Sequence, residues 1–464
     1  MNEENKNLID VANNLKVSIN GTFTKLCNEL LKRNNSSHIA SPKSIKTFTK
    51  SKLSMEDYIK LHDKDFEVLS FKRVDQRDEY YRDYCDITYV PDKYLDIWNQ
   101  YKFLEAIPQP VQKSDAWFAA RDLIISASSG AQAIDESKYE GWFAMVIAKL
   151  GLGEPFKENF HVHHGKKLET VATLLYEYIY NVKIGEFGLV PHIAEPNISF
   201  LGAIPDGICT NCTLDGKFSP LVGRMVEIKC VTTRQLNITG PENMWVKGEK
   251  DMAICPHIYW VQMQLQLECC DLEECDFWQC KLKNFWSDRT LRLAMDDIKP
   301  VHTVGQGVVI EIDPQLEYGT LIELLPIDKE LKSYEKIEWF GAYIYCDKLA
   351  CSLDEKICWA QDMKRNWKTY YPEYAKDYTF GKILYYHLQQ SHCYLVMRDR
   401  EWFKEALPRF AKFWDVVLMY RNDPVKRQEL IDSLALKIVE AKNKDKEERK
   451  YNKTGLQALD SDSD

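Results

Sequence analysis

Between residues 165 and 282 the chain changes several times between the 3.6-residue period of a helix and the two-residue period of a strand. The segment GKKLETVATLLYEYIYN has apolar residues at helical spacing, which predicts a helix. NISFLGAIPDGICT and LVGRMVEIKCVTT are short, apolar and bounded by turns, which predicts strands. PHIYWVQMQLQLECC then predicts a buried helix, and CDFWQCKLK a further strand. This order predicts an α/β (α+β) core, with a central mixed sheet flanked by helices.

Composition and helix breakers predict how the rest of the chain is divided. Residues 1–110 are expected to be an N-terminal extension of unknown role, ending near IPQPVQ, a predicted linker in which two prolines interrupt regular structure. The core is expected over residues 111–280, and a Trp/Tyr-rich, irregular insertion packed on that core over 281–390. A closing strand and C-terminal helix are expected over 391–440, with Pro408 as a kink. Residues 441–464 are charged and poor in apolar residues, which predicts a disordered tail.

The bulk properties are those of a folded intracellular protein. Hydrophobic residues make up 45% and charged residues 28% of the chain. No apolar run approaches the roughly 18–20 residues that a membrane span needs, so no membrane association is expected. The polar start MNEENKNLID is unlike a secretory signal, which predicts a cytoplasmic location. The 14 cysteines are therefore interpreted as reduced thiols, and Cys209 and Cys212 as two thiols around a turn.

The net charge of -9 at first opposes a nucleic-acid partner, because phosphate binding favours a basic surface. That objection carries little weight for a metal-dependent nuclease. The active site of such an enzyme is itself a cluster of carboxylates, and the bound cations reverse the sign of the local field. The acidic C-terminus, LDSDSD, contributes further negative charge. Net charge therefore neither supports nor excludes a nucleic-acid partner.

The residues that carry chemistry are Asp206, Glu227 and Lys229. Asp206 lies in Pro-Asp-Gly at the turn after an apolar strand, and Glu227-Ile228-Lys229 ends the apolar run MVEIKC. Because side chains alternate along a strand, Glu227 and Lys229 emerge on one face. If the two strands pair as a hairpin, Asp206 lies beside Glu227. Taken singly, Pro-Asp-Gly is a common turn and Glu-x-Lys a common solvated strand face; their order on neighbouring strands favours a site.

Two adjacent carboxylates suit Mg²⁺ or Mn²⁺, which prefer oxygen ligands. A divalent cation polarises a phosphoryl oxygen and lowers the pKa of water, which are the requirements of phosphodiester hydrolysis. The Lys229 ammonium would then position the nucleophile and stabilise the charge that develops on the phosphate.

With these residues in place, the chain resembles the PD-(D/E)xK nucleases, and in particular the lambda exonuclease/YqaJ-type viral recombinase family. Further segments that resemble this family are SDAWFAARDLIISAS, HHGKKLE, IYWVQMQLQLE and CYLVMRDREWFKEALPRF. The resemblance covers roughly residues 112–280 and 393–420. It implies that Arg121 and Ser128 bind a DNA 5′-phosphate, that Glu169 lies beside the metal, and that Gln262 and Gln264 lie at the edge of the active site.

The same resemblance implies a ligand set of Asp206, Glu227, the Ile228 carbonyl and Glu169. One or two Mg²⁺ ions are expected, with Mn²⁺ as a substitute. Some members of the family have a further acidic residue about ten positions before the Pro-Asp-Gly aspartate, and here Glu195 is the acidic residue near that position. The number of ions therefore stays open.

Each of these residues also has an ordinary structural alternative. Arg121 would serve equally in a surface ion pair, Ser128 as a helix cap, and Glu169 as an exposed helical residue. The glutamines lie among apolar residues, where a buried amide needs partners. His161, His163 and His164 precede Gly165 and are interpreted as part of a polar loop.

By resemblance, the implied activity is exonucleolytic hydrolysis of duplex DNA with free ends, 5′ to 3′, releasing 5′-phosphorylated nucleotides in viral recombination, repair or genome processing. A single-strand annealing protein and a homo-oligomer are the implied partners. If the chain is viral, it would act in host cytoplasm, virus factory or nucleus. Two alternatives remain: an endonuclease on the same fold, and a catalytically inactive DNA-binding scaffold.

Overall fold

A computed structural model describes residues 90–110, 114–139, 141–153, 158–192, 198–329 and 336–437. The chain divides into two compact units, one of residues 48–131 and 157–405 and the other of residues 1–47, 132–156 and 406–464. The larger unit contains every candidate site residue. The predicted disordered tail, Glu195 and most of the N-terminal extension lie outside the described residues.

The elements of the first half of the described chain are η2 (Asp92–Tyr94), α5 (Leu95–Ala106), α6 (Asp115–Asp122), β1 (Ile125–Ser126), η3 (Ala127–Ser129), α7 (Gly130–Ala133), α8 (Trp142–Lys149), α9 (Phe160–Tyr180), β2 (Ile184–Gly185), β3 (Val190–Pro191), β4 (Leu201–Ala203), β5 (Gly207–Cys209) and β6 (Met225–Cys230). Those that follow are α10 (His257–Cys270), β7 (Glu274–Phe285), α11 (Asp288–Asp297), β8 (Val301–Val304), β9 (Val308–Ile310), η5 (Pro314–Glu317), β10 (Tyr318–Pro326), η6 (Ile337–Phe340), β11 (Ala342–Tyr345), α12 (Leu353–Tyr370), β12 (Tyr378–Met397) and α13 (Arg400–Asn422).

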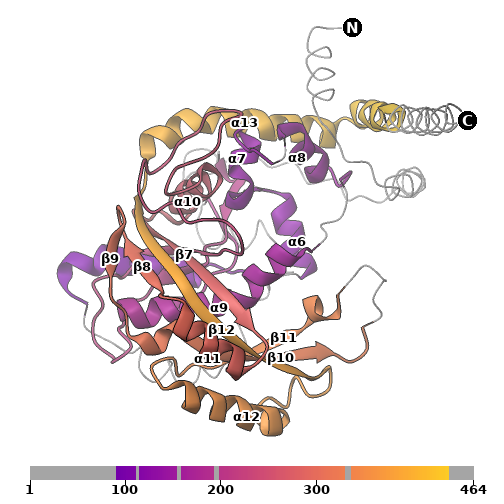
Figure 1. The fold of residues 1–464 in the computed structure, drawn as a ribbon. Coiled ribbons are helices and arrows are strands. Elements are labelled where there is room, and N and C mark those ends of the chain that lie inside the picture. Colours follow the sequence, from indigo (N-terminus) through magenta and orange to yellow (C-terminus); the bar gives the residue numbers. More distant parts are fainter. Residues whose placement is uncertain are drawn as a thin grey trace, which may run out of the picture. The chain divides into compact units, whose positions relative to one another are not determined.

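A nine-stranded mixed sheet organises the larger unit (Figure 1). Seven of its strands follow the order β11-β10-β12-β7-β6-β5-β2, and β8 and β9 extend it from β12. The pair β6–β7 is parallel, whereas β5–β6 and β7–β12 are antiparallel. A second sheet has three strands in the order β1-β4-β3. The predicted mixed sheet flanked by helices and the predicted order of helix, strands, helix and strand are therefore confirmed.

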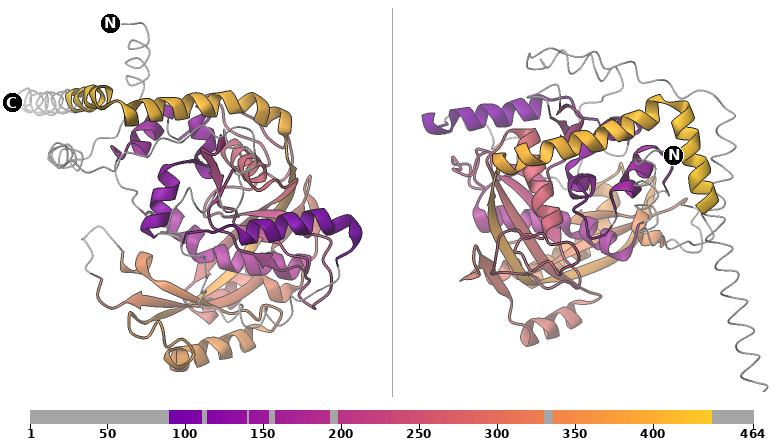
Figure 2. Two further views of the ribbon diagram at one scale, coloured as in Figure 1. Left: turned by 180° about the vertical axis from the view of Figure 1, so that it is seen from behind. Right: turned by 90° about the horizontal axis from the view of Figure 1, so that it is seen from above.

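Helices cover both faces of the nine-stranded sheet because its central strands are apolar on both sides. Trp278 of β7 donates its indole N–H to the Ala172 carbonyl of α9, at 2.9 Å. The neighbouring Phe277 points the opposite way, and its ring centroid lies 5.8 Å from that of Tyr259 on α10. Figure 2 shows the sheet and these helices from two further sides. Glu227, opposite Phe277 in the β6–β7 register, consequently belongs to the face that α10 covers.

The interpretation of residues 281–390 as an irregular insertion is wrong in one respect: the segment extends the sheet. It contains α11, α12 and the strands β8 to β11, and β10 pairs with β12 over nine residue pairs. The expected boundaries at residues 280 and 390 fall inside β7 and β12, so they cut continuous strands.

Two smaller expectations are also corrected. The residues before and within the expected linker are packed: Ile107 and Gln109 are buried, and the Gln109 amide donates to the Leu104 carbonyl at 3.2 Å. The expected polar loop of His161, His163 and His164 is the start of α9, capped by Asn159. Among the helices that the structure describes, none combines the length and the apolar composition that a membrane span requires.

The smaller unit includes α8, and α13 extends into it beyond residue 405. Trp142 at the start of α8 meets Phe413 of α13 edge to face, with ring centroids 5.6 Å apart. Arg421 and Arg427 donate to the carbonyls of Lys149 and Leu150, which lie at the end of α8, at 2.6 and 3.0 Å. Pro408 lies within α13, at the position where a kink was expected.

Buried histidines join β8 to β12. His302 Nδ1 lies 2.9 Å from the Ser391 hydroxyl, and His392 Nδ1 lies 2.9 Å from the Thr303 hydroxyl. Burial lowers the pKa of each histidine to about 4. A histidine whose folded-state pKa is depressed stabilises the fold above its unfolded pKa of about 6.5, and that contribution is lost as the pH falls towards the folded value.

We expect the free energy of unfolding to decrease by about 2 kcal/mol for each of these histidines between pH 7 and pH 5. Urea denaturation at the two pH values measures the decrease. The His392→Gln variant should show a decrease smaller by about 2 kcal/mol, because one proton-linked group is removed. An equal decrease in both proteins would contradict the assignment of the pH dependence to His392.

Candidate active site

Asp206 is held against β6 at the point where β5 no longer pairs with that strand. The β5–β6 register pairs Gly207 with Val226, and β5 begins at Gly207. Beyond this rung the Asp206 carboxylate accepts the Ile228 N–H at 2.8 Å. A side chain on Gly207 would overlap the Ile184 side chain, since its Cβ would lie 2.2 Å from Ile184 Cγ2. The predicted hairpin is therefore formed, and it brings Asp206 to the rung of Glu227.

Glu227 is fully buried, and both of its carboxylate oxygens have partners. One oxygen is ion-paired with the Lys229 ammonium. The other accepts a hydrogen bond from the Gln266 amide of α10 at 2.8 Å. This pairing offsets part of the cost of burying a carboxylate.

Lys229 lies two residues along β6 on the same face as Glu227, as predicted from the strand period. Its ammonium lies 5.0 Å from the centroid of the Tyr259 ring, within cation–π range. Burial acts against the charge, but the carboxylates of Glu227 and Asp206 raise the pKa of Lys229 above its usual value. The side chain is therefore cationic at neutral pH.

Negative charge at the site exceeds positive charge. Burial, followed by the neighbouring carboxylates of Glu227 and Glu169, raises the pKa of Asp206 well above the usual value. Lys229 and the Ile228 N–H act in the opposite direction. The structure thus places three acidic side chains within electrostatic range of one another around a single ammonium, an arrangement that a divalent cation would neutralise.

The main chain adds an oxygen to these carboxylates. In an extended strand the N–H and C=O of one residue point to the same side. The Ile228 N–H points to Asp206, so its carbonyl also points away from β7 and towards the carboxylates. Among the residues that the structure describes, no three His, Cys, Asp or Glu side chains group as a metal-binding set.

Glu169 and the two predicted glutamines lie on the helices that flank these strands. Glu169 is exposed on α9 and influences both Asp206 and Cys230 electrostatically. Gln262 is half-buried on α10. Gln264 is turned away from the carboxylates: its amide donates to the Met397 carbonyl at 2.9 Å and its oxygen accepts the Asp399 N–H at 2.7 Å.

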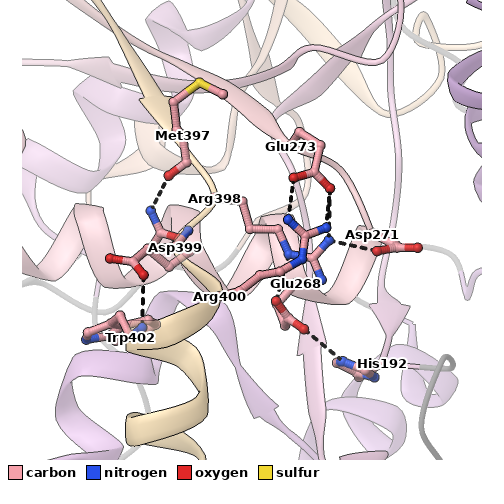
Figure 3. A network of polar contacts seen from close by, with 10 residues as sticks. His192, Glu268, Asp271, Glu273, Met397, Arg398, Asp399, Arg400 and Trp402 are labelled. Atoms are coloured by element: carbon pink, nitrogen blue, oxygen red, sulfur yellow. Dashed lines mark hydrogen bonds and ion pairs between the residues drawn. The ribbon is translucent and has the colours of Figure 1, made fainter.

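The part of α10 that follows Gln264 is fastened to the turn between β12 and α13. Arg398 donates to Glu268 at 2.8 Å and to Asp271 at 2.7 Å, and Arg400 pairs with Glu273 (Figure 3). Gln264 belongs to this structural attachment, and Gln266 occupies the position beside Glu227. Gln266 was missed from the sequence, although the spacing of four residues from Gln262 places both on one side of a helix.

Arg121 and Ser128 come from the segment that precedes the hairpin. Arg121 lies at the end of α6, with its guanidinium 4.6 Å from the centroid of the Trp117 ring. Burial lowers the pKa of Arg121, and Asp122 opposes the shift. Ser128 is exposed on η3, and its hydroxyl lies 3.3 Å from that of Ser126. A phosphate pocket formed by these two residues stays a prediction.

The strands and helices that carry this cluster match a known family. Residues 116–273 match the model of the YqaJ-like viral recombinase domain. This part of the chain therefore resembles the YqaJ-like viral recombinase domain. The match confirms the family resemblance and spans α6 to α10, and therefore Asp206, Glu227 and Lys229. The second segment of resemblance, residues 393–420, lies beyond it.

Known proteins also resemble larger parts of the chain. An uncharacterized protein of Acanthamoeba polyphaga mimivirus is 33% identical over 354 residues, which are 75% of this chain. The chain spans 60% of the length of that relative. Two crystal structures of LHK-Exo, an alkaline exonuclease from Laribacter hongkongensis, one with dAMP, each cover 68% of this chain and 98% of their own. Both are 17% identical, with TM-scores of 0.34 and 0.33, too low to establish a common fold.

The charge at Asp206 leads to a test of stability. A raised folded-state pKa means that ionisation of Asp206 disfavours folding above the usual carboxyl pKa. Asp206→Asn removes the charge and retains an acceptor for the Ile228 N–H. We expect it to stabilise the metal-free protein at pH 7, seen as a higher melting temperature in EDTA. Asp215→Asn is the control, because Asp215 is half exposed and already paired with Lys217. A lower melting temperature for Asp206→Asn would contradict the electrostatic analysis.

Proposed function

We propose that this chain is a divalent-metal-dependent deoxyribonuclease that degrades DNA from an end. The observation that carries the proposal is the convergence of Asp206, Glu227 and Lys229 on one edge of β6, within a YqaJ-like domain. Two carboxylates and an ammonium at one point suit the hydrolysis of a phosphodiester.

Asp206, Glu227 and the Ile228 carbonyl would hold the cation, and Glu169 would hold a second ion or its waters. The raised pKa of Asp206 supports this fit, since the charge that disfavours the metal-free fold would be neutralised. A bound Mg²⁺, or Mn²⁺ in its place, would polarise the phosphoryl oxygen and lower the pKa of a water molecule. The number of ions is not fixed by these ligands.

Lys229 would act on the phosphate. Its ammonium is fixed by Glu227 and faces Tyr259, so it is already oriented before DNA binds. An oriented cation stabilises the charge that develops on a phosphoryl group with little reorganisation. Gln266, which donates to both Glu227 and the Ile204 carbonyl, would keep Glu227 in place, and Gln262 would lie at the edge of the site.

The end preference rests on Arg121 and Ser128. A guanidinium suits a terminal phosphate because its donors form a planar fork, and Trp117 limits the orientations of the Arg121 plane. By family resemblance, digestion would run 5′ to 3′ on duplex DNA. It would leave a single strand for an annealing protein in viral recombination or genome processing, and the active form would be a homo-oligomer.

The catalytic role of Lys229 is tested by Lys229→Ala. We expect the hydrolysis rate of linear duplex DNA in Mg²⁺ to fall by about 100-fold or more, because the charge on the phosphate loses its ammonium. Lys217→Ala is the matched control, an exposed lysine that pairs with Asp215. Circular dichroism checks that both variants fold, and Asp206→Asn provides a second inactive variant that keeps its hydrogen bond.

The wild-type protein should degrade linear duplex DNA and leave a covalently closed circle intact. Cutting of the circle would point to an endonuclease. If Lys229→Ala and Asp206→Asn both degraded DNA at the wild-type rate, the site would lie elsewhere.

The phosphate pocket is tested with two duplexes that differ in the 5′ group. We expect the wild-type protein to degrade a 5′-phosphorylated end about tenfold faster than a 5′-hydroxyl end. Arg121→Ala should abolish this preference and leave degradation of the hydroxyl end unchanged. Arg292→Ala, which removes an exposed arginine of α11, should retain the preference. Equal rates on both ends in the wild-type protein would contradict a phosphate role for Arg121.

A further inference from the structure

Trp286 is an unusually exposed tryptophan at the end of β7. Its relative exposure is 74%, although the residue before it, Phe285, is buried in the core. The Lys382 ammonium of β12 lies 4.6 Å from the centroid of the indole ring. The same ammonium lies 3.3 Å from the Glu323 carboxylate and 3.6 Å from that of Glu338 in η6. Lys382 therefore links Trp286 to η6.

The short helix η6 brings two further aromatic rings to this place. Trp339 and Phe340 follow Glu338 in the chain and are half-buried. The ammonium of Lys336 lies 5.6 Å from the Trp339 ring, and that of Lys329 lies 4.1 Å from the Phe340 ring. We call Trp286, Trp339 and Phe340 the aromatic platform. Each of its rings has a lysine over it.

The aromatic platform is attached to the first turns of α9. The Tyr343 hydroxyl of β11 lies 2.8 Å from His163 Nε2, and the His163 and Trp339 rings have centroids 6.2 Å apart. The Tyr345 hydroxyl donates to the Lys167 carbonyl at 2.9 Å. Figure 1 shows β10 and β11, the strands on either side of η6 in the chain.

The same turns of α9 reach the candidate active site. His161 Nδ1 lies 2.6 Å from the hydroxyl of Thr232, three residues beyond Lys229. Glu169, on the third turn of α9, acts on Asp206. The start of α9 therefore contacts both the strand next to the aromatic platform and the chain just beyond Lys229.

The carboxylates around the aromatic platform are already paired. Glu323 and Glu338 both face Lys382, and Glu158 pairs with Lys166 and contacts His163. Lys382 is engaged by the first two of these carboxylates, so the positive charge that the rings offer to a phosphate comes chiefly from Lys329 and Lys336. This local balance suits a polyanion that also offers flat apolar groups.

We propose that the aromatic platform binds single-stranded DNA next to the active site. Unpaired bases stack on exposed aromatic rings while lysines follow the phosphates, whereas the bases of a duplex are hidden in its own stack. The inference rests on the proposed nuclease function for its choice of DNA. It concerns residues 286–382, which lie outside the matched YqaJ-like domain.

Fluorescence anisotropy of a labelled oligothymidylate of about 20 nucleotides tests the proposal, because this strand forms no duplex. Binding is measured with the full chain in EDTA, so that no hydrolysis is needed. We expect Trp286→Ala to weaken binding about tenfold, the loss of one base stacked on a ring. Because Trp286 is largely exposed, the variant should fold, and its melting temperature verifies this.

Tyr139→Ala is the matched control. Tyr139 is also exposed, at 71%, and has the Lys138 ammonium 5.2 Å from its ring, but it belongs to the other compact unit. We expect this variant to bind like the wild-type protein. Equal affinity of wild type and Trp286→Ala, equal weakening by both variants, or no binding of the oligothymidylate by the wild-type protein would overturn the proposal.

Failure of the two proposals can be told apart. If the wild-type chain binds the oligothymidylate through Trp286 but hydrolyses no DNA in Mg²⁺, the nuclease assignment would be rejected and the aromatic platform would stand. If the wild-type chain hydrolyses DNA but Trp286→Ala binds the oligothymidylate normally, the nuclease assignment would stand and the aromatic platform would be rejected. Binding of blunt duplex alone, with no affinity for the single strand, also counts against the aromatic platform.

Discussion

The hydrogen bond from the Ile228 N–H to the Asp206 carboxylate determines the geometry of the candidate site. In a longer hairpin the main chain of β5 would accept that N–H, but β5 begins at Gly207, which pairs with Val226, two residues before Ile228. An aspartate side chain takes the place of the missing strand. It satisfies a donor that would otherwise lack its ladder partner, and it brings a charge beside Glu227. The hydrogen bond between Ile228 and Asp206 thus lies where the pairing of β5 with β6 ends, and it places the first carboxylate of the cluster.

Such a cluster needs a rigid support, because buried carboxylates repel one another. The support comes from the alternation of side chains along β6. Val226 and Ile228 belong to the apolar core beneath α9, while Glu227 and Lys229 point to the face of α10. The core therefore holds the strand in place against the repulsion on its other face. Local instability at a functional site, compensated by packing elsewhere, is common in enzymes.

The sequence patterns with short periods predicted this part of the molecule well. A strand period of two placed Glu227 and Lys229 on one face, and the turn at Pro-Asp-Gly placed Asp206 beside them. The pattern of α10 was harder to interpret, since Gln262, Gln264 and Gln266 are spaced by two residues in a helix of period 3.6. Gln264 and Gln266 consequently point in different directions, and partners distant in the chain, Met397 and Glu227, decide their roles. The pairing of β10 with β12 depends on similarly distant contacts, which a local pattern of residues does not report.

The pairing of β10 with β12 also shows that residues 281–390, which were predicted to be an insertion, form part of the main sheet. The β10–β11 strands contact α9 through the hydroxyls of Tyr343 and Tyr345. Glu169, two residues after Lys167, points to a different side of that helix, because successive residues turn by about 100°. One helix therefore has contacts with the added strands on one side and carries a carboxylate near Asp206 on another. A displacement of these strands would move Glu169 relative to β6, so the added segment and the geometry of the cluster are mechanically connected.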